Sequence, residues 1–200
     1  MFALLCCFII ATQSEKGETV LYFSHHRTAL ANTFFAFWTH AGELYPFVIA
    51  SVGYLVWQQW RKAGGVALAG LLVLLTSHAA KLFFASPRPF AYFEQLHRAS
   101  ELTDVNGVLS DFLSFPSGHT TAAFAVYTLL ALYTVPRLKP YFVLPLLFAA
   151  TGVAVSRVYL AVHFCEDVLA GSVLGVCIAS FCYLAFSLVE PSTSKVEFST

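Results

Sequence analysis

Five long apolar stretches, separated by short polar interruptions, constrain the fold of this 200-residue chain more than any other feature. They run over residues 45–60, 64–84, 119–133, 141–159 and 167–189. A helix that spans a lipid bilayer needs about 20 apolar residues, and these stretches approach or reach that length. Only 11% of the residues are charged, whereas soluble domains have roughly a quarter. We therefore expect a polytopic membrane protein, with lipid as the solvent for most of its surface.

The remaining segments are consistent with one helical domain. Residues 2–11 form a shorter apolar segment, which would raise the number of transmembrane helices to about six, and residues 29–38 are typical of a helix near the membrane interface. We expect an all-α membrane helix bundle over residues 1–189, followed by a disordered polar tail, residues 190–200. Gly171 and Gly175 form a G-x-x-x-G pattern, which indicates close helix packing.

Two short basic turns predict the orientation of the bundle. They lie at residues 61–62 and 137–139, and basic residues in short loops favour the cytoplasmic side of a membrane. Alternation of the spans then places residues 85–116 and 157–166 together on the outer face. The compact size suggests a bacterial inner-membrane protein whose outer face is periplasmic. The formal net charge of zero argues against a nucleic-acid partner.

Three polar clusters interrupt the apolar pattern, and all three fall on the expected outer face. They comprise Lys81 and Arg88, then Ser117, Gly118 and His119, and finally Ser156, Arg157, His163 and Asp167. Three cations facing one pocket would repel one another unless an anion joined them, and Lys and Arg side chains bind phosphate oxygens well. Backbone N–H groups of Ser117 and Gly118, at the start of a helix, would point at the same anion.

The two histidines of these clusters suggest chemistry at the bound anion. If a helix begins at or before His163, Asp167 shares its face and can hold one imidazole nitrogen, which leaves the other as a nucleophile. His119 is then free to act as a general acid. Taken singly, each residue has a structural explanation, such as a helix-end anchor for Arg157. Their joint occurrence predicts a phosphoryl-transfer site. The spacing matches no catalytic metal site, so we expect no metal or other cofactor.

The same residues resemble the signature of a known family. The segments Lys81-x6-Arg88-Pro89, Pro116-Ser117-Gly118-His119 and Ser156-Arg157-x5-His163-x3-Asp167 are similar to the three-part signature of the type-2 phosphatidic acid phosphatase superfamily. The resemblance implies a membrane enzyme of six helices that removes phosphate from lipid phosphates or diphosphates without a metal. It also implies roles for individual residues: His163 forms a phosphohistidine, Asp167 orients it, His119 protonates the leaving oxygen, and the phosphate is held by Lys81, Arg88, Ser117, Gly118 and Arg157.

The sequence leaves the substrate and the fate of the phosphate open. Undecaprenyl diphosphate, phosphatidylglycerol phosphate, phosphatidic acid and a lipid A phosphate are all compatible with the signature. One alternative is a phosphotransferase that passes the phosphate to a second lipid. Another is a membrane protein that binds anionic lipids without catalysis, although such a protein would need the three cations and not the pair His163 and Asp167. Residues 90–115, which join the first two clusters, are where we expect substrate specificity.

Overall fold

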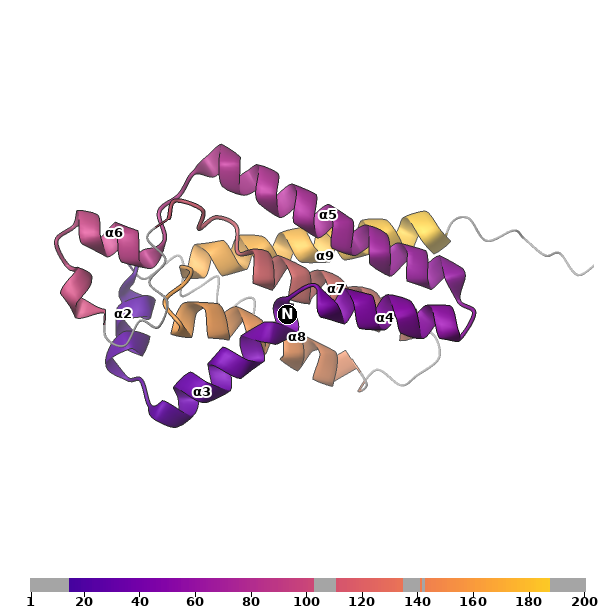
Figure 1. The fold of residues 1–200 in the computed structure, drawn as a ribbon, viewed down its shortest axis with the longest axis horizontal. Coiled ribbons are helices and arrows are strands. Elements are labelled where there is room, and N and C mark those ends of the chain that lie inside the picture. The colour runs from indigo at the N-terminus through magenta and orange to yellow at the C-terminus, as the bar shows by residue number, and fades with distance from the viewer. Residues whose placement is uncertain (1–14, 103–110, 135–140, 142, 188–200) are drawn as a thin grey trace, which may run out of the picture.

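The computed structural model of the chain describes residues 15–102, 111–134, 141 and 143–187. All regular secondary structure in these ranges is helical (Figure 1), which confirms the all-α prediction. In chain order the elements are α2 (Glu18–His25), α3 (Ala29–Trp38), the 3-10 helix η1 (Thr39–Gly42), α4 (Tyr45–Val56), α5 (Trp60–Phe84), α6 (Pro89–Gln95), the 3-10 helix η2 (Ala99–Glu101), α7 (Gly118–Thr134), α8 (Val143–Tyr159) and α9 (Cys165–Ser187). The apolar segment 2–11 and the tail 190–200 lie outside the described residues.

The five long helices α4, α5, α7, α8 and α9 coincide with the five predicted apolar stretches. The largest difference concerns Trp60, which we expected to end the first stretch. It is instead the first residue of α5, because the chain turns at Gln58, whose backbone has the left-handed φ of 57°. The interfacial segment forms α3 with the bounds expected from the sequence.

The described helices differ in their ability to cross a bilayer. Two stretches are long and apolar enough, one containing α5 and the other α9. Helix α4 has 12 residues and α8 has 17, so they rise about 18 and 26 Å against a hydrocarbon thickness of about 30 Å. In the described part of the chain, two helices rather than six therefore meet the length and apolarity of a full span.

Helix α7 is the centre of the bundle and packs against α5, α8 and α9. Helix α9 approaches the backbone of α7 closely at two glycines. A Cβ atom added to Gly171 would lie 2.7 Å from the Ser117 carbonyl oxygen, and one added to Gly175 would lie 2.5 Å from the Thr121 carbonyl oxygen. The predicted close packing through G-x-x-x-G is confirmed, because any side chain at these positions would push the helices apart.

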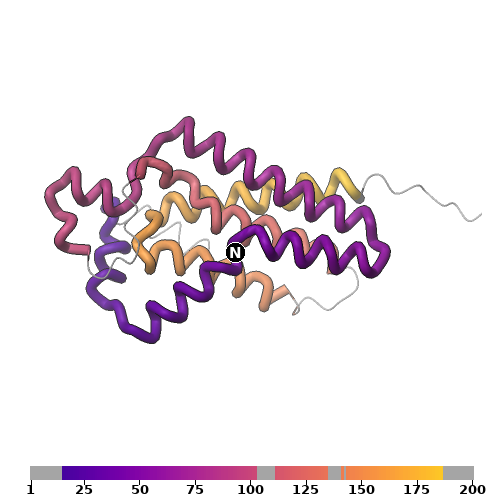
Figure 2. The backbone as a smooth tube through the Cα atoms, viewed as in Figure 1, coloured from indigo at the N-terminus to yellow at the C-terminus, as the bar shows by residue number. Residues whose placement is uncertain are grey.

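The helix ends that carry the polar clusters gather at one end of the bundle. The C-terminal ends of α5 and α8 and the N-terminal ends of α7 and α9 lie towards the left of Figures 1 and 2, near α2 and α6. The turn between α4 and α5, which precedes the basic residues Arg61 and Lys62, lies at the opposite end. The bundle thus has one end with the basic turn and another end with the candidate site.

Candidate active site

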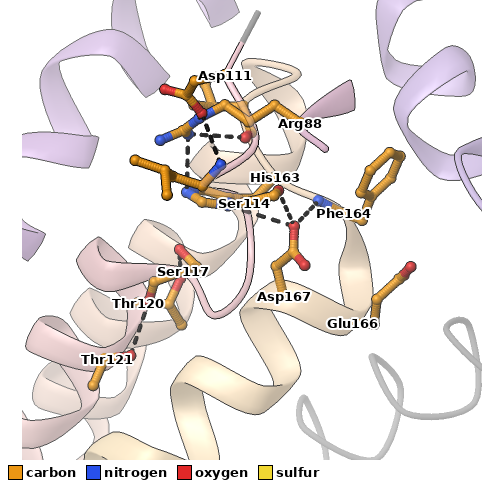
Figure 3. A network of polar contacts seen from close by, with 12 residues as sticks. Arg88, Asp111, Ser114, Ser117, Thr120, Thr121, His163, Phe164, Glu166 and Asp167 are labelled. Atoms are coloured by element: carbon orange, nitrogen blue, oxygen red, sulfur yellow. Dashed lines mark hydrogen bonds and ion pairs between the residues drawn. The ribbon is translucent and has the colours of Figure 1, made fainter. Parts of the chain in front are cut away.

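His163 lies in the connection between α8 and α9, beside the carboxylate of Asp167. Helix α9 begins at Cys165, so the condition stated for a shared helix face, a helix that begins at or before His163, is not met, although the two residues do pair. They meet because Asp167, in the first turn of α9, turns back towards this connection. His163 Nδ1 is 3.5 Å from Asp167 Oδ2, and the same oxygen accepts a hydrogen bond from the Phe164 N–H at 2.9 Å (Figure 3).

Ser114, which belongs to no motif found in the sequence, completes the support of this pair. Its hydroxyl donates to Asp167 Oδ2 at 2.5 Å and lies 3.4 Å from His163 Nδ1. Ser114, His163 and Asp167 are all at least 98% buried. The carboxylate is therefore held in place by several donors, and it can hold the imidazole in turn.

The contacts of His163 determine which ring nitrogen carries the proton. Arg88 Nη1 is 3.4 Å from His163 Nε2, and because a guanidinium can only donate, Nε2 must accept. The proton then resides on Nδ1, which faces Asp167. Burial lowers the pKa of His163 to about 4, even though the hydrogen bond with Asp167 raises it. At neutral pH the ring is uncharged and has a lone pair on Nε2, as a nucleophile requires.

Arg88 places its positive charge at the edge of this imidazole. The residue is 8% exposed, and its Nε donates to Asp111 Oδ1 at 2.5 Å while Nη1 donates to the Val162 carbonyl oxygen at 3.2 Å. Burial by itself raises the pKa of Asp111, but hydrogen bonds from Arg88 and from the Leu113 N–H lower it below its usual value. An ionised Asp111 therefore fixes the orientation of Arg88.

Arg157, in the last turn of α8, is buried and only partly hydrogen-bonded. Its Nη1 donates to Thr39 Oγ1 at 2.9 Å, whereas its buried Nε has no hydrogen-bond partner among the described residues. A buried donor without a partner is costly, so a phosphate oxygen at this position would be stabilised. The neighbouring Ser156 donates to the Val153 carbonyl oxygen of its own helix at 2.6 Å, and its hydroxyl thus faces the backbone.

Part of the second cluster and Lys81 line a cavity of about 460 Å³ between α4, α5 and α7. Lys81, Gly118 and His119 all contribute to its wall. A Cβ atom added to Gly118 would meet one neighbouring atom within 4 Å, Lys81 Nζ at 3.8 Å. The N-terminal end of α7 therefore faces open space beside an ammonium group, an arrangement suited to an anion.

Ser117 does not have the position expected from the sequence. Its N–H donates to the Asp167 carbonyl oxygen at 3.0 Å, and its fully buried hydroxyl is hydrogen-bonded to Thr120 Oγ1 at 3.0 Å. The N–H is thus used inside the protein, whereas the hydroxyl shares one hydrogen bond with Thr120. Ser117 instead connects α7 to α9, and the free N–H groups at this helix end are those of the first turn, from Gly118 onward.

Lys81, Arg88 and Arg157 bring the positive charge of three side chains to the site. Within the residues that the structure describes, no group of three His, Cys, Asp or Glu side chains is arranged to hold a metal ion. Asp111, Ser114 and Thr39 contact the site but were missed in the sequence. Asp111 and Ser114 could have been suggested only by their nearness in the sequence to the cluster that begins at Ser117. Thr39 had no such signal, because it lies more than a hundred residues from its partner Arg157.

Comparisons with known proteins identify the family of the chain. The chain matches the family model of the PAP2 superfamily over residues 62–190. Lipid phosphate phosphatase 1 of Arabidopsis thaliana is 33% identical over 143 residues, which cover 61% of this chain and 43% of that protein. The chain spans less than half the length of the curated relatives it matches.

Two crystal structures resemble the fold over nearly their whole length. Aquifex aeolicus LpxE has a TM-score of 0.67 and 26% identity, covering 86% of this chain and 97% of that one. A transmembrane PAP2-type phosphatidylglycerolphosphate phosphatase from Bacillus subtilis has a TM-score of 0.65 and 25% identity, covering 96% and 95%.

Proposed function

The chain belongs to the PAP2 superfamily, and we propose that it is an integral membrane lipid phosphatase that acts through a phosphohistidine at His163. The observation that carries this proposal is the environment of His163: Nδ1 faces a buried carboxylate, and Nε2 accepts from Arg88 at the edge of the ring. Such an imidazole is uncharged, oriented and next to a cation that attracts phosphate.

We propose a reaction in two displacements. His163 Nε2 attacks the phosphorus atom, the bond from phosphorus to the lipid oxygen breaks, and His119 gives a proton to that oxygen. In the second step water attacks the phosphorus of the phosphohistidine, the P–N bond breaks, and His119 takes a proton from the water. Asp167 stabilises the positive charge that develops on the His163 ring in the first step.

We assign the phosphate oxygens to Lys81, Arg88, Arg157 and the first turn of α7. The unpartnered Nε of Arg157 and the open space beside Gly118 support this assignment. No metal ion takes part, since three cations neutralise the charge that a metal would otherwise neutralise. Preorganised charges in a site of low dielectric constant stabilise the transition state more strongly than they would in water.

The cavity supports a lipid as the substrate. Apart from the polar residues at its outer end, its wall includes apolar side chains of Leu44, Phe47, Val73, Leu74 and Ala122. A tail that continues inward along these side chains would remain in an apolar phase, while its headgroup meets Lys81 and His119. The similar proteins act, by their names, on different lipid phosphates, so the substrate candidates of the sequence stay open. We place the catalytic end on the outer or periplasmic face, opposite Arg61 and Lys62 in the first turn of α5.

Phosphate release by the purified chain tests the proposed function. A panel of phosphatidic acid, phosphatidylglycerol phosphate, a polyprenyl diphosphate and a lipid A phosphate would be compared in liposomes. We expect release from at least one lipid, complete loss in His163→Ala, and a smaller loss in Asp167→Asn, because Asp167 orients the nucleophile without replacing it. Transfer of phosphate to an added lipid alcohol, without release, would instead indicate a phosphotransferase. Undiminished release by His163→Ala would contradict the proposal.

A further inference from the structure

A short segment between α3 and α4, residues 39–43, contacts the candidate site although it lies outside the region that matches the family model. At its first residue, Thr39 Oγ1 accepts a hydrogen bond from Arg157 Nη1 at 2.9 Å. Near its end, a Cβ atom added to Gly42 would lie 2.6 Å from the His119 carbonyl oxygen. The backbone of the segment therefore lies directly against the first turn of α7.

A further hydrogen bond holds the segment against α7. The hydroxyl of Tyr127 donates to the Ala41 carbonyl oxygen at 3.1 Å. Because Tyr127 lies about two turns after His119 on the same helix, the two contacts fix the segment at two heights along α7. The side chain that follows, Glu43, consequently has a defined position relative to His119.

Glu43 Oε1 lies between two imidazole rings. It accepts a hydrogen bond from His40 Nδ1 at 2.6 Å and is 4.0 Å from His119 Nε2. Both Glu43 and His119 line the cavity, and the Glu43 side chain is 39% exposed. The separation between Glu43 Oε1 and His119 Nε2 is within ion-pair distance for a protonated His119 ring, but it is longer than a hydrogen bond.

The charges around His119 show what this carboxylate can do. Burial of the ring is the largest influence against a proton on His119, and the positive charges of Arg157 on α8 and Lys81 on α5 add to it, as would His163 and His40 if they were protonated. All of these charges disfavour an additional proton on His119, yet a general acid must carry one before it can donate it. Glu43 also interacts with Arg157 and Tyr45, and it is the carboxylate that contacts His119 directly in the described part of the chain.

We propose that Glu43 is a positioning residue for His119: it stabilises the protonated ring and turns its Nε2–H towards the leaving oxygen, while His40 holds the carboxylate in place. Glu43 can have this role only in the phosphatase proposed above, since it acts through the proton that His119 donates. The segment 39–43 then positions two residues of the site, His119 through Glu43 and Arg157 through Thr39.

Two substrates separate this role from a merely structural one. A short-chain phosphatidate has an alkoxide leaving group that needs a proton, whereas p-nitrophenyl phosphate releases a stable phenolate anion. We expect Glu43→Gln to lower kcat about 10-fold or more for the phosphatidate and to change it little for p-nitrophenyl phosphate. Without the carboxylate, the His119 ring should lose its proton more easily. The decline of kcat at high pH should therefore begin at a lower pH than in the unmodified chain. Glu43→Asp keeps the charge and should retain part of the activity.

A double-mutant cycle gives the second readout. In a His119→Gln background, Glu43→Gln should cause no further loss of kcat, because the proton donor is already absent. Glu18→Gln is the matched control, since Glu18 is an exposed carboxylate in α2 at the same end of the molecule and should leave both substrates unaffected. The thermal midpoint of Glu43→Gln should equal that of the unmodified chain.

Equal losses on both substrates, losses that multiply in the double variant, or unchanged kinetics of Glu43→Gln would each overturn the role of Glu43. The proposed function fails separately. If His163→Ala and His119→Gln both keep full activity on the phosphatidate, the phosphatase mechanism is wrong. If these two variants are inactive while Glu43→Gln matches the unmodified chain, only the positioning role is wrong.

Discussion

Replacement of Gly171 by Ala should damage the site through helix packing alone, without touching a reactive side chain. The new methyl group would lie 2.7 Å from the Ser117 carbonyl oxygen and 3.1 Å from Thr121 Oγ1. An ordinary contact begins near 3.4 Å, so α9 must move from α7 by about 0.7 Å. That displacement would occur one turn from Asp167, whose carbonyl oxygen accepts the Ser117 N–H.

The expected magnitudes follow from this displacement. Overpacking costs about 1–3 kcal/mol, and Ala in place of Gly in a helix recovers about 0.5–1 kcal/mol, which leaves a net loss of about 0.5–2 kcal/mol. For a chain of this size that corresponds to a fall in Tm of about 1–8 °C. A misplacement of 1 Å can reduce a rate about 100-fold, so we expect kcat to fall about 10-fold or more.

Two other glycines provide the comparison. A Cβ atom on Gly53 would contact only Trp57, at 3.8 Å, so Gly53→Ala should leave kcat unchanged and raise Tm slightly. Gly175→Ala, one turn further from Asp167 and more tightly packed, should lower Tm more than Gly171→Ala does and affect kcat less. The measurements are thermal unfolding in detergent and phosphate release from a lipid phosphate. If Gly171→Ala matched the unmodified chain in both, close packing of α7 and α9 would not be what positions the nucleophile.

Three further predictions concern pH, inhibition and orientation. Because burial lowers the pKa of His163 to about 4, the nucleophile should stay uncharged as the pH falls from 7 to 5, and kcat/KM corrected for substrate ionisation should not decline near pH 6.5. The fold itself should lose stability between about pH 6.5 and 4, because the unfolded chain binds a proton there that folded His163 does not. Vanadate, which can adopt a five-coordinate geometry, should inhibit, whereas EDTA should not; loss with EDTA that Mg²⁺ restores would overturn the metal-free mechanism. In a chain without its native cysteines, Glu101→Cys should react with an impermeant thiol reagent applied from outside, and Arg61→Cys should not. The reverse labelling pattern would show that the orientation is inverted.

The sequence predicted the helices well because apolar runs in a membrane protein are long and their ends are marked by polar residues. The start of α4 was correct for this reason, and the bounds of the interfacial helix α3 were correct as well. The sequence also placed the polar clusters at one end of the bundle, since alternating spans bring alternate helix ends together. The turn at Gln58 was missed, because a left-handed residue between two apolar runs leaves no composition signal, and α5 therefore begins earlier than expected.

The site was predicted less completely than the fold, because its second layer of contacts comes from connections rather than from periodic helices. The pairing of His163 with Asp167 was expected on a shared helix face, but it arises from a carboxylate that turns back over the first turn of α9. Ser114 supports that carboxylate from a loop without periodicity. Ser117 was expected to bind phosphate, and its N–H is used between α7 and α9 instead; hydrogen bonds between distant backbone groups have no signature in a sequence.

The central claim is that phosphate passes through His163. The purified chain would be mixed with a lipid carrying a ³²P-labelled phosphate, quenched in alkali within the first turnover, and digested to locate the label. Alkali preserves a phosphorus–nitrogen bond that acid would hydrolyse. We predict label on the peptide that contains His163, formed at a rate at least equal to kcat, and none in His163→Ala. Turnover of the lipid without labelled His163, or label on a different residue, would contradict the mechanism.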